Sequence, residues 1–378
     1  MQNQAFPLID VEGDARERGR QHGAKAAERI HRSIEIYIGA LDRYKFGRAE
    51  FQSLTAELAD RMTAYDAEQV EEMRGMAEGA KVPFEHIILC NGRSELLGLA
   101  KRQQDGLPDA CTAAVVLPEA SADGVLMHGQ NWDGMYEQAD VCIVLRIRRE
   151  DGPDILTFTE AGQMARNGFN TAGIAITGNN LESERDYLKI GVPLPMVRRK
   201  ALATPHYAHA IMHVYGTPKS GSNNMTLSHI EGETIDIECA PDESFVLHPE
   251  NGLMVHANHW ENPSARARLI DRVAIESAAR ILTPDSFYRS NRVRKFLTPK
   301  VGKITFDDFK QAFMDKFGEP YSVLRSVLPN AAEGGTICTT ATIVMRPAEG
   351  IMEVARLTAQ NPHFTRYTLA PKSERAAA

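Results

Sequence analysis

The sequence contains no apolar run that approaches the ~20 residues needed to span a bilayer. Its first residues, MQNQAFPLIDVEGDARERG, lack the positive flank and apolar stretch of a secretory signal. Lysine and arginine together number 43 against 50 aspartates and glutamates, and no basic cluster is long enough to follow a phosphate backbone. We therefore expect a cytoplasmic protein that binds neither membranes nor nucleic acids.

Cysteine is scarce, and no pair of cysteines has the C-x-x-C spacing of a structural zinc site or redox centre. An odd number of widely spaced cysteines also argues against a disulfide framework. No G-x-G-x-x-G or Walker loop is present, so nucleotide binding is not indicated. We expect no metal or organic cofactor. The cysteines are Cys90, Cys111, Cys142, Cys239 and Cys338.

The chain has 378 residues, of which 43% are hydrophobic and 25% charged, a globular composition. From Ala15 to about Gly79 apolar residues recur at helical spacing, as in Ile30, Ile34 and Ile38. The segment KRQQDGLPDA is expected to be a turn-rich, exposed connector, because it is polar and contains glycine and proline.

Short apolar segments bounded by Gly, Asp, Asn and Pro follow this connector, and they predict antiparallel hairpins. Helices are expected again over residues 195–215 and from Ser264 and Thr305, and strands at TATIVMRP and IMEVARL close the chain. This order of elements favours an α+β layered fold over a βαβ repeat. The predicted hairpin strands are CTAAVVL, GVLMHGQNW, VCIVLRI, DILTFTE and AGIAITGNN.

Cys111 stands where the connector meets the first of these strands. A cleavage before it would expose an α-amino group with a pKa of ~7.7–8.0, which could take the proton of the thiol at neutral pH. Asp133 lies at the end of the expected neighbouring strand, so antiparallel pairing would bring it back toward Cys111. On position alone, a small buried apolar residue is the simpler expectation for Cys111.

The ordered segments DACTAAVVLP, ADGVLMHGQNWD, TFTEAGQMARNGFNTAGIAITGNNL and LMVHANHW resemble the acyl-coenzyme A:6-aminopenicillanic acid acyltransferase (C45 peptidase) family of N-terminal-nucleophile hydrolases. The resemblance implies a four-layer αββα fold and an inactive precursor. It also implies autocleavage between Ala110 and Cys111, which leaves an N-terminal helical segment, residues 1–110, associated with a catalytic segment, residues 111–378.

The resemblance also implies roles for individual residues. Cys111 matches the nucleophile, Asp133 the acid that holds the new α-amine, and Asn258 the asparagine that donates to the oxyanion. A backbone N–H at either Asn179 or Asn180 would complete the oxyanion hole.

The family's arginine before the penultimate strand is missing, because Thr339 and Thr340 stand there. Arg325 could substitute for it, although a surface position is the simpler expectation for this side chain.

The resulting hypothesis is an autoprocessing amidohydrolase or acyltransferase that cleaves a linear amide of a small N-acyl compound through a thioester on Cys111. Water is the expected acceptor, and acyl-CoA-dependent N-acyl transfer is the alternative. The expected partners are a small amide or acyl substrate and the two associated fragments, with a homo-oligomer left open.

Two further interpretations stay open. An uncut chain could pair Cys111 with His128 or His259 as a Cys-His hydrolase, and a chain without catalysis could bind acyl compounds.

Other histidines could suggest a metal site. His206, His209 and His213 would share one face of a helix, but a solvated face is the simpler expectation. His256 and His259 flank Asn258 and are expected in a strand or turn, where they would be structural or line the substrate.

Overall fold

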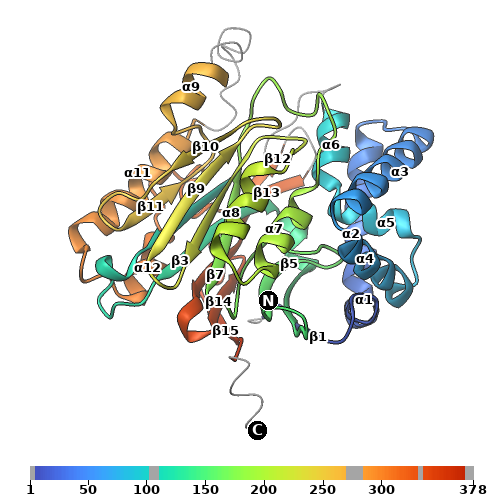
Figure 1. Ribbon diagram of the computed structural model, residues 1–378. Helices are drawn as coiled ribbons and strands as arrows, with labels where there is room; N and C mark the ends of the chain where they lie inside the picture. Colours follow the sequence, from blue (N-terminus) through green and yellow to red (C-terminus); the bar gives the residue numbers. More distant parts are fainter. Residues whose placement is uncertain (1–4, 102–109, 270–283, 331–334, 371–378) are drawn as a thin grey trace.

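The computed structural model describes residues 5–101, 110–269, 284–330 and 335–370 (Figure 1). Two β-sheets lie face to face, and helices cover the outer side of each. Across the described ranges, no helix has both the length and the apolar character that crossing a membrane requires.

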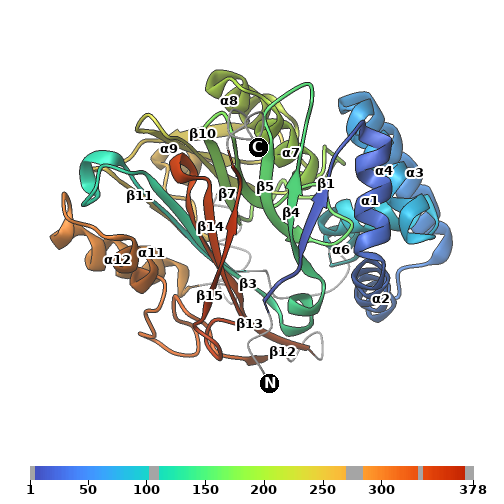
Figure 2. The ribbon, with the colours of Figure 1, turned by 90° about the horizontal axis from the view of Figure 1, so that it is seen from below.

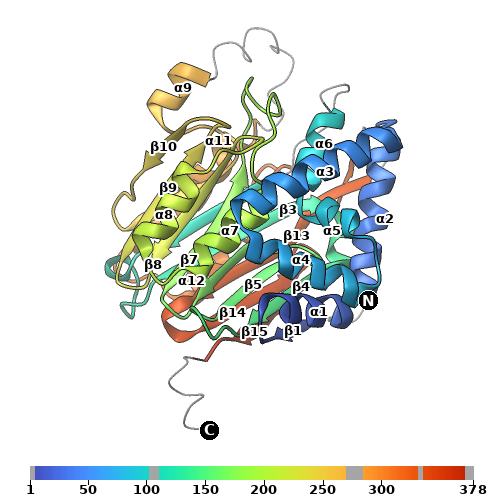
Figure 3. The ribbon, with the colours of Figure 1, turned by 45° about the vertical axis from the view of Figure 1, so that its right-hand side comes forward.

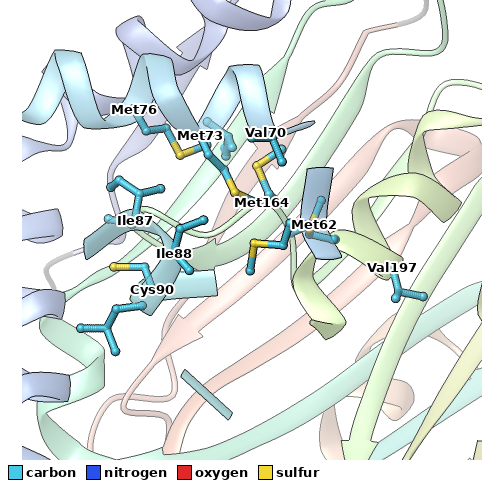
Figure 4. Packing of buried hydrophobic residues seen from close by; sticks show 14 of the residues in the cluster. Met62, Val70, Met73, Met76, Ile87, Ile88, Cys90, Met164 and Val197 are labelled. Carbon is cyan, nitrogen blue, oxygen red and sulfur yellow. The ribbon is translucent and has the colours of Figure 1, made fainter. Parts of the chain in front are cut away.

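The N-terminal helices confirm the helical pattern expected from Ala15 onward. Asp14 begins the first helix by accepting a hydrogen bond from the backbone of Glu17 at 2.8 Å, and Asp66 caps the fourth in the same way. Their apolar faces form one core, to which both Met73 and Ile88 belong (Figure 4). The helices are α1 (Ala15–Lys25), α2 (Ala27–Arg43), α3 (Arg48–Tyr65), α4 (Ala67–Ala80), α5 (Phe84–Asn91) and α6 (Arg93–Lys101).

The first sheet has the strand order β1-β4-β5-β6-β7-β8-β9-β10. Strand β1 pairs with β4 in parallel, and the other neighbours are antiparallel. Its strands are β1 (Leu8–Val11), β4 (Cys142–Ile147), β5 (Ile155–Glu160), β6 (Asn167–Asn170), β7 (Ile174–Asn180), β8 (Asn223–His229), β9 (Glu233–Cys239) and β10 (Ser244–Leu247). Helices α7 (Leu194–Ala203) and α8 (Tyr207–Gly216) lie on its outer face with α4 (Figure 3).

The second sheet has the order β11-β2-β3-β13-β14-β15, and β12 pairs with β13. Its strands are β2 (Cys111–Val116), β3 (Met127–Met135), β11 (Leu253–His256), β12 (Leu328–Asn330), β13 (Gly335–Arg346), β14 (Ile351–Arg356) and β15 (Phe364–Thr368). Helices α9 (Pro263–Leu269), α11 (Ser286–Leu297) and α12 (Phe306–Ala312) follow β11 in the chain, and short 3₁₀ helices span Pro118–Ala120, Tyr136–Asp140, Thr298–Lys300 and Pro347–Glu349.

Three apolar layers hold these elements together, which confirms the four-layer αββα arrangement (Figure 2). Ile30 and Ile176 belong to the layer between the N-terminal helices and the first sheet. Trp132 and Phe158 meet between the sheets, with ring centroids 5.9 Å apart. Phe309 belongs to the third layer, where α11 and α12 pack on the second sheet.

Some elements differ from the sequence prediction. The sequence did not predict strands β1, β6, β8, β9, β10, β12 and β15, and β13 begins at Gly335 rather than at Thr340. The helix expected over residues 195–215 is two helices separated near Pro205. Of the connector KRQQDGLPDA, residues 102–109 lie outside the described residues, as does the continuation of the helix expected from Ser264 beyond Leu269.

Candidate active site

Cys111 is the first residue of β2, as predicted, and it is 1% exposed. It belongs to the apolar layer between the sheets, together with Trp132, its antiparallel partner on β3. Its backbone is held on both sides. The N–H donates to Oδ1 of Asn258 at 2.8 Å, and the carbonyl accepts from Nη1 of Arg289 at 2.5 Å.

The Ala110–Cys111 peptide bond is held in a fixed orientation. The Ala110 carbonyl oxygen accepts a hydrogen bond from the backbone N–H of Asp133 at 3.0 Å, while Asn258 holds the nitrogen of the same peptide. A donor on the carbonyl oxygen stabilises negative charge that develops there during nucleophilic attack.

Asp133 lies in β3 next to the partner of Cys111, as strand pairing predicted, and it is fully buried. Its Oδ1 accepts from the Thr339 hydroxyl at 2.7 Å, and its Oδ2 lies 3.1 Å from Nε of Arg325. Burial raises the pKa of Asp133 to about 6, and the positive charges of Arg325 and Arg289 limit that rise. The Asp133 carboxylate thus contacts Thr339 and Arg325. The side chain that contacts the Cys111 nitrogen is that of Asn258.

The Asn258 side chain connects three parts of the site. Its Oδ1 accepts from Cys111 N and from Nη2 of Arg289, the latter at 2.7 Å, and its Nδ2 donates to the Asn180 carbonyl at 2.9 Å. Because a guanidinium can only donate, the oxygen of the amide must face Arg289. Nδ2 is therefore the atom that could serve an oxyanion.

The two asparagines at the end of β7 have different positions. Asn180 contacts Asn258 directly through its carbonyl. The backbone N–H of Asn179 donates to Asn224 at 2.9 Å and is therefore already engaged, while its side chain donates to the Ala257 carbonyl at 2.9 Å. Asn180 is the better candidate of the two, and Asn179 supports the segment that carries Asn258.

Arg325 is 5% exposed, so the expectation of a surface arginine is wrong. Its backbone is fixed to Thr339 in both directions: its N–H donates to the Thr339 hydroxyl at 2.8 Å, and its carbonyl accepts from Thr339 N at 3.1 Å. Thr339 and Thr340 themselves lie inside β13. The side chain of Arg325 points into the site, where it meets Asp133 and Asp285.

Sequence reasoning missed Asp285 and Arg289, which lie one helical turn apart at the start of α11. Oδ2 of Asp285 accepts from Nε of Arg289 at 2.6 Å and also from Nη2 of Arg325. A chain of alternating charges therefore runs from Asp133 through Arg325, Asp285 and Arg289 to Asn258. The i, i+4 spacing of Asp285 and Arg289 was the available signal.

Replacing Asp285 with asparagine is expected to destabilise the protein by ~3–5 kcal/mol, because two buried guanidiniums would lose their shared carboxylate. Urea unfolding measures the change. Glu57→Gln is the control, since it breaks the exposed Glu57–Arg61 pair and should cost less than ~1 kcal/mol. A loss for Asp285→Asn as small as that of the control would contradict the structural role of this chain of charges.

The histidines of the Cys-His alternative have other partners. His128 is buried. Its Nδ1 lies 2.8 Å from the Ser228 hydroxyl, and its Nε2 lies 2.8 Å from the Thr177 hydroxyl. Burial lowers the pKa of His128 to about 3. Nδ1 of His259 lies 2.7 Å from the Ser286 hydroxyl. These contacts give neither ring the role of a base for Cys111.

The histidines that were considered as metal ligands lie in two separate places. His206 and His209 are exposed at the start of α8 and His213 is half-buried, as a solvated helix face predicts. His256 ends β11 and bonds Glu238 at 2.7 Å; although its burial opposes the charge, Asp236 and Glu238 raise its pKa to about 10. In the part of the chain that the structure describes, no group of three or more His, Cys, Asp or Glu could hold a metal.

The other cysteines are buried in apolar layers. Cys90 lies in the helical core (Figure 4), and burial raises its pKa and that of Cys142 to about 12. Burial raises the pKa of Cys338 to about 12 as well. Thiols of this kind are inert.

The chain is similar to a known acyltransferase along most of its length. The chain is 26% identical over 337 residues to the 40 kDa form of acyl-coenzyme A:6-aminopenicillanic-acid-acyltransferase from Emericella nidulans, and the alignment covers 87% of each protein.

Among solved structures, a mutant of conjugated bile acid hydrolase from Clostridium perfringens has 14% identity and a TM-score of 0.46, covering 68% of this chain and 92% of that one. Penicillin V acylase from Agrobacterium tumefaciens has 11% identity and a TM-score of 0.45, covering 68% and 86%. These scores are low, so the fold assignment rests on the sheets and helices described above.

The family model for acyl-coenzyme A:6-aminopenicillanic acid acyl-transferase matches residues 120–361, a range that begins after Cys111 and contains Asp133, Asn258, Arg289 and Arg325. This match spans more than half of the sequence, and the chain belongs to that family.

Proposed function

We propose that this chain is an autoprocessing amidohydrolase or acyltransferase whose nucleophile is the thiol of Cys111, exposed at a new N-terminus. The observation that carries the proposal is the Ala110–Cys111 peptide, whose oxygen is bonded by Asp133 N–H and whose nitrogen is bonded by Asn258. Membership of the acyltransferase family supports the same chemistry.

Cleavage would proceed within this arrangement. The Cys111 sulfur attacks the Ala110 carbonyl carbon, and the Asp133 N–H stabilises the oxyanion. The bond from that carbon to the Cys111 nitrogen breaks, the thiol proton passes to the nitrogen, and a thioester remains. Water then hydrolyses the thioester and releases the N-terminal segment with a carboxylate at Ala110.

The new α-amine would serve as the base in turnover. Its ordinary pKa of ~7.7–8.0 leaves part of it unprotonated near neutral pH, and Oδ1 of Asn258 already faces this nitrogen. The thiol adds to a substrate amide, the substrate amine leaves, and the acyl group stays on sulfur until water accepts it. Asn258 Nδ2 and the Asn180 backbone are the proposed neighbours of the oxyanion. Asp133, whose carboxylate Arg325 contacts, is the proposed group that stabilises the charged amine.

An amine could accept the acyl group in place of water, with an acyl-CoA thioester as the donor. The 40 kDa relative, whose name is acyl-coenzyme A:6-aminopenicillanic-acid-acyltransferase, favours this second candidate. A panel of small N-acyl amides and acyl-CoA thioesters, with and without added amine, separates the two by the product formed. Turnover that survives complete alkylation of Cys111 would contradict both, and binding without turnover would favour a non-catalytic acyl-binding protein.

The two fragments are expected to stay together after cleavage. The N-terminal segment supplies β1, which pairs with β4, and the helical layer on the first sheet. Gel filtration should therefore elute both fragments in one peak, and they should separate only in denaturant. Separation under native conditions would contradict this expectation.

A further inference from the structure

Three buried arginines lie outside the charge network of Asp285. Arg93 on α6, Arg166 before β6 and Arg198 on α7 are 7%, 8% and 5% exposed. Burial lowers the pKa of Arg198 most, the positive charges of Arg166 and Arg93 lower it further, and the negative charge of a Cys111 thiolate raises it. Arg166, Arg93 and Cys111 therefore each lie within electrostatic range of Arg198.

Arg166 packs on the ring of Trp132, the residue that pairs with Cys111 across the strands. Its guanidinium carbon lies 4.1 Å from the ring centroid of Trp132, and Trp132 is the antiparallel partner of Cys111. The side chains of Trp132 and Cys111 both belong to the layer between the sheets.

Arg198 reaches β7 at Gly178. A Cβ at that position would lie 2.9 Å from Nη2 and 3.4 Å from Nε of Arg198, so the absence of a side chain admits the guanidinium. The Gly178 carbonyl accepts from Gln130 of β3 at 2.8 Å, and the next residues along β7 are Asn179 and Asn180. Arg198 therefore lies against the strand end that carries the candidate oxyanion residues.

No carboxylate of the described residues balances Arg198. Glu160 lies 3.0 Å from Arg93, and burial raises the pKa of Glu160 to about 7. Arg198 has neither an ion pair nor a hydrogen bond to any residue of the described ranges, and its Nε is buried without an acceptor. Burial lowers the pKa of Arg198 to about 9, because the charged form of a buried guanidinium without a counter-charge is destabilised.

We propose that Arg198, assisted by Arg166, binds a carboxylate of the substrate whose amide carbonyl lies at Cys111. The preferred substrate class is then an N-acyl compound with a free carboxylate. A guanidinium matches a carboxylate through two parallel hydrogen bonds. An acyl-CoA would not fit in the same way, because the pantetheine arm separates its phosphates from the thioester. With the thioester carbonyl at Cys111, the phosphates would lie too far away to bind Arg198. The inference rests on the proposed role of Cys111 as the nucleophile.

Two alkylating reagents test this site without a known substrate. Iodoacetate and iodoacetamide both transfer a carbon to the Cys111 sulfur and release iodide, but only iodoacetate carries a carboxylate. Arg198→Gln should lower the ratio of their rate constants at Cys111 by ~10-fold or more, the size of a lost charge-assisted hydrogen bond, and change the iodoacetamide rate by less than ~3-fold. Arg198→Lys should keep part of the preference for iodoacetate.

Arg61→Gln is the matched control, because it removes one positive charge from an exposed pair on α3 and should leave the ratio of rate constants unchanged.

Arg198→Gln should melt at or above the wild-type temperature, since it removes a buried charge without a partner. A clearly lower melting temperature would mean that Arg198 is structural. If Arg198→Gln leaves the ratio of the two rate constants unchanged, or slows the reactions with both reagents equally, the carboxylate site is wrong and the proposed function stays intact. If neither reagent modifies Cys111, the proposed function fails and the carboxylate site fails with it.

Discussion

Cys111→Ala is expected to remain one uncut chain of 378 residues and to lose amide turnover by at least ~10,000-fold. The substitution removes the sulfur that attacks the Ala110 carbonyl, while the bond from Asp133 N–H to that carbonyl remains. Gel electrophoresis under denaturing conditions reports the uncut chain, and a rate assay on an accepted amide reports turnover. Cys111→Ser keeps an attacking oxygen and should be cleaved slowly.

Cys142→Ala is the matched control for this prediction. Cys142 is fully buried in the same layer between the sheets, and its thiol bonds the Gln138 carbonyl at 3.1 Å. Its loss should lower stability modestly and leave cleavage and turnover intact. Normal cleavage in Cys111→Ala, or its loss in Cys142→Ala, would contradict the assignment of the nucleophile.

Asn258→Ala is expected to lower turnover per cleaved molecule by ~100- to 1,000-fold, the usual effect of removing one oxyanion donor. It also removes the acceptor for Cys111 N and for Arg289, so autocleavage should slow as well. The fraction cleaved over time and the turnover rate after titration of reactive thiols give the two effects separately.

Asn258→Asp divides the two functions of this side chain. It keeps an oxygen facing Cys111 N and Arg289 but removes the Nδ2 donor. Autocleavage should therefore approach that of the wild type, while turnover should fall as in Asn258→Ala. If Asn258→Ala stays within ~3-fold of the wild type in turnover, Asn258 has no part in oxyanion stabilisation.

The parts of the site that strand pairing controls could be predicted from the sequence. Cys111 and Asp133 belong to neighbouring strands of one hairpin, and antiparallel register places residue 132 opposite residue 111. Asn258 required the resemblance to a family, because β11 joins β2 from a distant part of the chain.

Asp285, Arg289 and the orientation of Arg325 could not be predicted in this way. Arg289 bonds the carbonyl of Cys111 across 178 residues, and nothing local to α11 specifies that contact. Arg325 points inward because its backbone is fixed to Thr339. Long-range packing, rather than local preference, decides such positions.

Strand β8 was missed because its buried side chains are largely polar. Asn224 and Thr226 both donate to Asp236 of β9, and Ser228 lies against His128 between the sheets. A strand whose buried positions are satisfied by hydrogen bonds lacks the apolar run from which strands are predicted.

The central claim, that Cys111 becomes an N-terminus and acts there as the nucleophile, is tested most directly by N-terminal sequencing with intact mass of the purified, active protein. We expect two N-termini, one of which begins CTAAVV, and masses that correspond to cleavage after Ala110. Full activity on amides from one uncut chain, or cleavage at another bond, would contradict the account.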